Sequence, residues 1–109
     1  MEIKSIIYEN NNQTLIINIG YKNEIKYKDI LGTLSNEKIY EYLKNLFCVI
    51  NNWNPVYINN YVIDGGGWKL SILYDNGKKK EYSGKADYPS NFEVFEMLNQ
   101  KLIEEVQYE

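Results

Sequence analysis

The sequence predicts an α+β fold: a mainly antiparallel six-stranded sheet with two helices on one face, in the order βββα-βββα. Three observations predict it: six short runs patterned as strands, two longer segments with helical spacing, and an Asn-Gly turn between two of the strands. A chain of 109 residues is large enough for one core and too small for two. We therefore expect a single domain over residues 1–109, with pseudo-halves of about 1–54 and 55–109.

Three strand-like runs precede the first helix. Residues 2–8 form a short apolar run, and residues 14–21 and 24–28 alternate apolar with polar side chains, as half-buried strands do. Ser35 is placed to cap a helix over residues 36–51, where apolar side chains recur at helical spacing.

The second half repeats this order. Residues 56–63 and 68–74 read as strands, joined by a glycine-rich turn over residues 64–67. A capping box beginning at Ser90 then opens a helix over residues 91–107, which carries an apolar stripe.

The Asn-Gly turn allows two registers for the hairpin around it. A two-residue loop at Asn76-Gly77 places Tyr82 opposite Ser71, whereas a three-residue loop with Gly77 in the left-handed conformation places Tyr82 opposite Leu70. We favour the second register because it keeps Tyr82 on the apolar face.

The two halves align without a gap, and identical residues then coincide at strand, cap and helix positions. These pairs are Ile3 with Ile58, Leu15 with Leu70, Ile17 with Ile72, Tyr27 with Tyr82, Ser35 with Ser90, and Leu43 with Leu98. An internal duplication explains the matches, and so do two halves that merely share an architecture under a skewed composition.

Composition argues against catalysis. The chain has no His and its 12 basic residues are all Lys, so it lacks both an imidazole base or metal ligand and a bidentate anion clamp. We expect no catalytic residues, no metal and no cofactor. The net charge of −3 and pI of about 5.0 do not favour nucleic-acid binding. The lone Cys48 and the lack of a long apolar stretch lead us to expect a cytoplasmic protein that does not insert into a membrane.

Five residues are candidates for a phosphate site. Successive glycines at Gly65, Gly66 and Gly67 could form an anion nest, although a flexible hairpin turn explains them better because no P-loop follows. Lys78 and Lys80 beside Tyr82 could track a nucleic-acid backbone, but lysines there also protect the edge of a sheet, which is the reading we favour.

Acidic and aromatic residues suggest a surface for protein binding. Glu93 and Glu96 lie toward the outer side of the last helix, either as a solvated face or as a docking surface for a basic protein. The 11 tyrosines exceed what one core needs, and exposed tyrosines with asparagine are typical of recognition surfaces, although AT-rich codon usage also enriches both. These surplus tyrosines, Tyr88 among them, do not all fit one apolar face. The surplus tyrosines are Tyr8, Tyr42, Tyr57, Tyr61, Tyr88 and Tyr108.

One stretch of the second half resembles a known pattern. It reads Gly67-Trp68-Lys69-Leu70-Ser71-Ile72-Leu73-Tyr74, then Gly77, Tyr82-Ser83-Gly84 and Tyr88-Pro89-Ser90-Asn91-Phe92. This hairpin-plus-helix pattern resembles small uncharacterised proteins of low-GC Gram-positive bacteria and their phages. The resemblance carries over no functional residues. It implies an accessory protein of a mobile element, a class in which inhibitors of bacterial defence systems are common.

The sequence therefore favours a small non-enzymatic domain that binds another protein, as a phage or mobile-element inhibitor of a host defence system would. Two alternatives stay open. One is a protein that sequesters a small nucleotide or signal ligand through Lys78, Lys80 and the glycines, and the other is a bacterial housekeeping domain. The sequence does not set the oligomeric state, and a homodimer is compatible with it.

Overall fold

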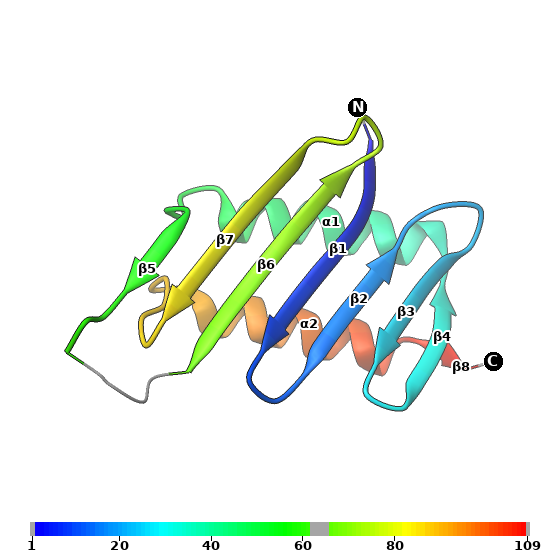
Figure 1. Ribbon diagram of the computed structural model, residues 1–109. Helices are drawn as coiled ribbons and strands as arrows, with labels where there is room; N and C mark the ends of the chain where they lie inside the picture. The colour runs from blue at the N-terminus through cyan, green and yellow to red at the C-terminus, as the bar shows by residue number, and fades with distance from the viewer. Residues whose placement is uncertain (1, 62–65, 109) are drawn as a thin grey trace.

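The computed structural model describes residues 2–61 and 66–108, and its elements appear in chain order in Figure 1. The strands are β1 (Ile3–Asn10), β2 (Thr14–Asn18), β3 (Asn23–Tyr27), β4 (Ile30–Leu34), β5 (Val56–Ile58), β6 (Gly67–Tyr74), β7 (Lys79–Lys85) and β8 (Gln107–Tyr108). The helices are α1 (Asn36–Ile50) and α2 (Phe92–Glu104). Within the described residues, no helix is long and apolar enough to cross a membrane.

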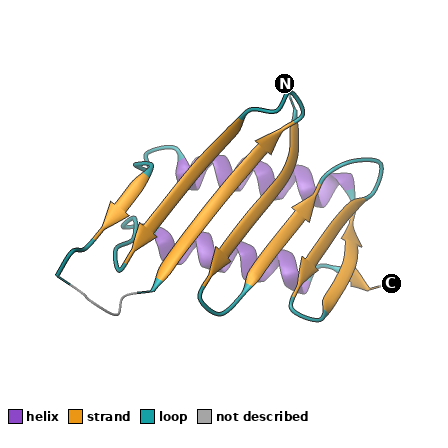
Figure 2. Ribbon diagram, in the orientation of Figure 1, coloured by secondary structure: helices purple, strands orange, loops and turns teal. Residues whose placement is uncertain are grey.

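A single sheet in the strand order β5-β7-β6-β1-β2-β3-β4-β8 forms one layer, and both helices cover one of its faces (Figure 2). The prediction of an α+β fold with both helices on one face is confirmed. The helices run antiparallel, since Lys38 near the start of α1 pairs at 3.0 Å with Glu105 just beyond the end of α2. The start of α1 also agrees with prediction, because Ser35 Oγ accepts the backbone N–H of Lys38.

The core lies between the helices and the apolar face of the central strands. Its most completely buried side chains are Ile6, Ile17, Ile25, Leu46, Leu70, Ile72 and Phe95. Those from strands belong to the alternating runs identified in the sequence, and burying each stabilises the fold by roughly 1.5–3 kcal/mol. The alternation therefore places one side of every central strand under the helices.

The predicted count of six strands is wrong, because the described residues form a sheet of eight. No element is predicted over the segment that forms β4, which includes Gly32. A side chain at Gly32 would overlap the backbone of Gln107 and the side chain of Val106. The helix predicted over residues 91–107 ends at Glu104, and the chain returns as β8 to pair with β4.

Within the described residues, the strand predicted over residues 56–63 ends at Ile58 and pairs differently, and residues 62 and 63 lie outside that part of the chain. β5 pairs in parallel with β7 at the edge of the sheet, instead of forming a hairpin with β6, so the sheet is mixed. Of the turn predicted over residues 64–67, Asp64 and Gly65 lie outside the described residues, and Gly67 already belongs to β6.

The structure limits the alignment of the two halves. The aligned residues Ile3 and Ile58 do not occupy equivalent places, because β1 lies in the middle of the sheet and β5 at its edge. The alignment holds better elsewhere: α1 corresponds to α2, and Leu15 and Leu70 are both buried in the core. The halves therefore share a hairpin and a helix, but not a common strand order.

The register predicted for the β6–β7 hairpin is confirmed. Tyr82 lies opposite Leu70, and Gly77 has a φ of 87° in a loop closed by Tyr74 and Lys78. The same register places Lys80 opposite Ile72, with its side chain exposed beyond the core.

The capping box predicted at Ser90 is not formed. The N-cap of α2 is Asn91, and its side chain makes no capping hydrogen bond. That amide instead accepts a hydrogen bond from Trp53 and donates one to the carbonyl of Val49. Hydrogen bonds to Trp53 and Val49, which are distant in the sequence, therefore replace the predicted local cap.

Candidate functional site

Four elements meet around a pocket at the strand ends where β1 finishes and β6 begins, at the bottom of the sheet in Figure 1. We call this pocket the mouth; its volume is about 360 Å³. Its lining residues are Tyr8, Asn10, Asn11, Asn12, Gly66, Gly67, Trp68, Tyr88, Phe92, Glu93 and Glu96. The mouth is thus built from β1 and its turn, the start of β6, the loop before α2, and the first turns of α2.

Five of the eight candidate residues from the sequence line the mouth: Gly66, Gly67, Tyr88, Glu93 and Glu96. Lys78 and Lys80 do not, because they lie at the turn of the β6–β7 hairpin and just after it, toward the opposite end of β6. Gly65 lies outside the described residues. The structure therefore does not bring the two lysines and the glycines into one site.

The β1 side of the mouth is a rigid polar turn. Asn10 Oδ1 accepts the backbone N–H groups of Asn12 at 2.9 Å and Gln13 at 3.0 Å, an Asx-type turn that reverses the chain into β2. The same side chain donates to the Tyr8 hydroxyl at 3.1 Å. One asparagine thus fixes both the turn and the phenol beside it.

Aromatic rings form one wall. Trp68 is buried, and its indole N–H donates to the Asp87 carbonyl at 2.9 Å. The ring of Tyr88 lies over it, with centroids 6.3 Å apart and planes within 16°, and Phe92 lies 4.9 Å from both. Because 46% of Tyr88 is exposed, this stack presents an aromatic face to solvent.

Helix α2 contributes acidic side chains to the mouth. Phe92 and Phe95 turn toward the core, which leaves Glu93 and Glu96 on the side of the helix that lines the mouth. Burial raises the pKa of the Tyr8 phenol, the Asn10 hydrogen bond lowers it, and the negative charge of Glu96 raises it further. None of the described lining residues is a lysine. The electrostatics of the mouth therefore favour a cation.

A smaller pocket of about 120 Å³ adjoins the mouth, and we call it the side chamber. The two share Tyr8 and Glu96 as a common wall. The other lining residues of the side chamber are Gln13, Leu15, Tyr27, Asn99, Gln100 and Ile103. The mouth and the side chamber are therefore neighbours beside α2, and we call the pair the trough.

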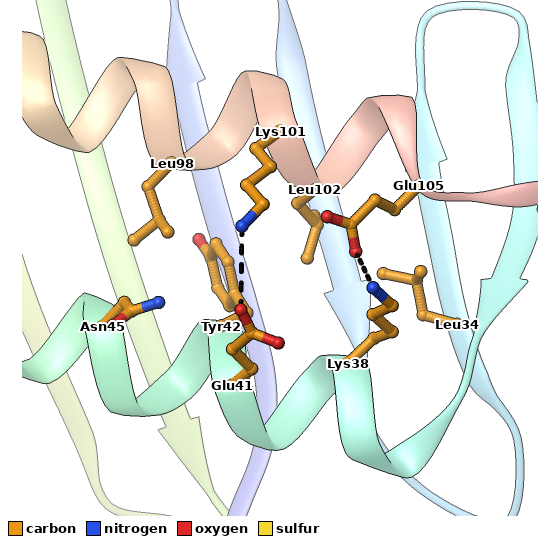
Figure 3. A pocket seen from close by; sticks show the side chains of 9 residues that line it. All are labelled: Leu34, Lys38, Glu41, Tyr42, Asn45, Leu98, Lys101, Leu102 and Glu105. Carbon is orange, nitrogen blue, oxygen red and sulfur yellow. Dashed lines mark ion pairs between the residues drawn. The ribbon is translucent and has the colours of Figure 1, made fainter.

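The pocket between the helices is a different kind of feature (Figure 3). Its volume is about 20 Å³, room for about one water molecule. The ion pairs Lys38–Glu105 and Glu41–Lys101 span it, with N–O distances of 3.0 and 3.6 Å. We interpret it as a packing gap of the helix pair.

The surplus tyrosines divide between surface and core. Tyr61, Tyr88 and Tyr108 are exposed, whereas Tyr8 and Tyr42 are buried. The buried pair fits in the core because both hydroxyls find partners: Asn10 for Tyr8 and Asn99 for Tyr42. Tyr57 is half-buried. Tyr21 and Tyr40 are exposed as well.

Sequence reasoning missed much of the mouth, namely Tyr8, Asn10, Asn11, Asn12, Trp68 and Phe92. The asparagine run at the end of the first strand-like segment is the sequence signal that could have found some of them. Among the described residues, no group of three His, Cys, Asp or Glu side chains could hold a metal. Cys48 is exposed on α1.

Comparisons with protein-family models, with curated protein sequences and with solved structures return no match to this chain.

Proposed function

We propose that this protein binds a basic segment of a protein partner, and that the mouth receives a lysine or arginine side chain of that segment. One observation carries the proposal: Glu93 and Glu96 line the same pocket as the exposed Tyr88 ring, with no lysine among the described lining residues. Carboxylates form charge-assisted hydrogen bonds with ammonium or guanidinium groups, and an aromatic face attracts a cation in addition.

The same observation disfavours the nucleotide alternative at this site. Two carboxylates repel a phosphate, and the two lysines assigned to the phosphate in that alternative, Lys78 and Lys80, are distant. Lys80 lies opposite Ile72, roughly 16 Å of strand rise from Gly67. An inhibitor of a host defence system, which the resemblance to phage proteins suggests, would be one protein of the proposed kind, its ligand being a basic segment of the host target.

The test is a titration followed by ¹H–¹⁵N NMR, which measures weak binding and locates it. The cationic probe is N-acetyl-lysine N-methylamide, and the matched neutral probe is the norleucine analogue. We expect the cationic probe alone to shift the backbone amide resonances of Glu93, Glu96 and Tyr88. Equal binding of the norleucine probe would refute recognition of charge.

Variants assign the binding to the mouth. The double change Glu93→Gln and Glu96→Gln keeps side-chain shape and removes both charges, and should weaken binding about tenfold or more. Glu104→Gln removes an exposed charge at the far end of α2 and is the control. Lys78→Gln with Lys80→Gln should also leave binding unchanged. Weakening by the lysine changes would show instead that the probe binds outside the mouth.

A further inference from the structure

Asn99, which lines the side chamber, carries a buried hydrogen-bond donor without a partner among the described residues. Only 6% of Asn99 is exposed, and its Oδ1 accepts the Tyr42 hydroxyl at 2.7 Å. Its Nδ2 has no hydrogen-bond partner among the described residues, although Asn99 lines the side chamber. A buried N–H without an acceptor is unfavourable, so such groups are normally completed by water or by a ligand.

The bond from Tyr42 fixes which end of the amide is free. Tyr42 lies on α1, is buried, and uses its hydroxyl as the donor to Asn99. The amide of Asn99 is thereby held with its acceptor toward α1, and its donor is the atom left without a partner. An acceptor atom that reached this N–H from the side chamber, such as a carbonyl oxygen, would complete it.

The rest of the side chamber has neutral polar chemistry. Gln13 and Gln100 contribute amides and Tyr27 a hydroxyl, while Glu96 on the wall shared with the mouth is the only charged residue among the described lining. Amide side chains pair with the N–H and C=O groups of a peptide backbone as readily as with each other. A negatively charged ligand group is disfavoured beside Glu96, so the expected acceptor is an uncharged carbonyl.

The spacing along α2 suits an extended chain. Glu93 and Asn99 are six positions apart, which is about 9 Å of helix rise. An extended peptide covers this distance in about three residues. By axial length alone, a segment whose basic side chain enters the mouth needs about three residues to bring a backbone carbonyl to the side chamber.

We propose that the trough binds an extended peptide, with its basic side chain in the mouth and a backbone carbonyl accepting a hydrogen bond from Asn99 Nδ2. This inference rests on the proposed function and adds to it the length and backbone recognition of the partner segment. It also assigns Asn99, which no sequence pattern marked, as a specificity-determining residue.

The test compares one-residue and four-residue probes in NMR titrations. The short probe is N-acetyl-lysine N-methylamide. The long probes are two capped tetrapeptides, one with Lys first and three Gly after it, the other with Lys last, because the chain direction is open. We expect one tetrapeptide to bind about tenfold more tightly than the short probe and to shift the side-chain NH₂ resonances of Asn99.

A double variant tests the donor itself. Asn99→Leu combined with Tyr42→Phe removes both hydrogen-bonding partners, so no buried polar atom of the pair is left unpaired. It should lose the tetrapeptide advantage and still bind the short probe. Asn45→Leu, the same change at an exposed position of α1, should retain the advantage. The dispersion of the NMR spectrum verifies that each variant is folded. The shift of the Asn99 side-chain resonance in the unmodified protein is a second readout, which does not depend on any variant.

The outcomes separate the two proposals. If the short probe binds but neither tetrapeptide binds more tightly or shifts Asn99, the amide holds only water; the extended-peptide inference is wrong and the proposed function stands. If no cationic probe binds, the proposed function is wrong and the inference falls with it.

Discussion

The indole N–H of Trp53 donates a 2.6 Å hydrogen bond to Oδ1 of Asn91, the residue that begins α2. The Nδ2 of Asn91 donates in turn to the carbonyl of Val49 in the last turn of α1, at 2.8 Å. Trp53 packs against Trp68 and Phe92, with ring centroids 5.6 and 5.9 Å away. One amide therefore joins the end of α1 to the start of α2 and holds the rings behind the mouth.

We predict that Asn91→Ala lowers the free energy of unfolding by about 2–3 kcal/mol, because it leaves the Trp53 N–H and the Val49 carbonyl without partners. Ser90→Ala should change this free energy by less than about 0.5 kcal/mol, because the N-cap of α2 is Asn91 and not Ser90. Urea unfolding of both variants measures the difference. A larger loss for Ser90→Ala would restore the capping box.

This contact illustrates why local sequence signals located α2 but not its surroundings. Pro, Ser and Asn before an apolar stripe correctly indicate a helix start. They do not reveal that the Asn91 amide is used by groups far away in the chain. The same limit applies to β5, since consecutive strands usually form hairpins and only the packed structure shows β5 beside β7.

The candidate site was predictable only in part for a related reason. Helical periodicity places Glu93 and Glu96 away from the core whatever the tertiary structure. The mouth, however, also needs Asn10 to lie opposite Trp68, which is a register between β1 and β6. Nothing local in either strand specifies that pairing. Residues on one helix were therefore identified, and residues joined across the sheet were missed.

A second prediction concerns the hairpin turn. Gly77 has a φ of 87°, and a side chain there would meet nothing within 4 Å. Gly77→Ala should cost about 1 kcal/mol of stability, entirely through backbone conformation. Gly20→Ala is the matched control, because a methyl group there makes ordinary contact and no left-handed backbone is required. Equal effects of the two changes in thermal unfolding would contradict this explanation.

A third prediction concerns the support of the aromatic wall. A side chain at Gly84 would overlap the Trp68 indole and the Asp87 carbonyl, the two groups that hydrogen-bond to each other. We expect Gly84→Ala to destabilise the protein by about 3 kcal/mol and to alter Trp68 fluorescence. Gly67→Ala, whose methyl group would lie 3.7 Å from the Gly84 carbonyl, should be tolerated. An unaltered emission spectrum for Gly84→Ala would show that the indole can shift without cost.

The last prediction is loss of stability at alkaline pH through Tyr42. Burial raises the pKa of its phenol above the ordinary value near 10. Above pH 10 the unfolded chain therefore ionises at this position while the folded protein does not, and stability falls as pH rises, by about 1.4 kcal/mol at pH 11 from this group. Tyr42→Phe should be less stable at pH 8, because Asn99 Oδ1 loses its donor, yet should lose less stability between pH 9 and pH 11. Tyr21→Phe, at a fully exposed tyrosine, should follow the unmodified protein throughout. Urea unfolding across this pH range measures all three, and parallel curves for Tyr42→Phe and the unmodified protein would show that Tyr42 ionises without unfolding.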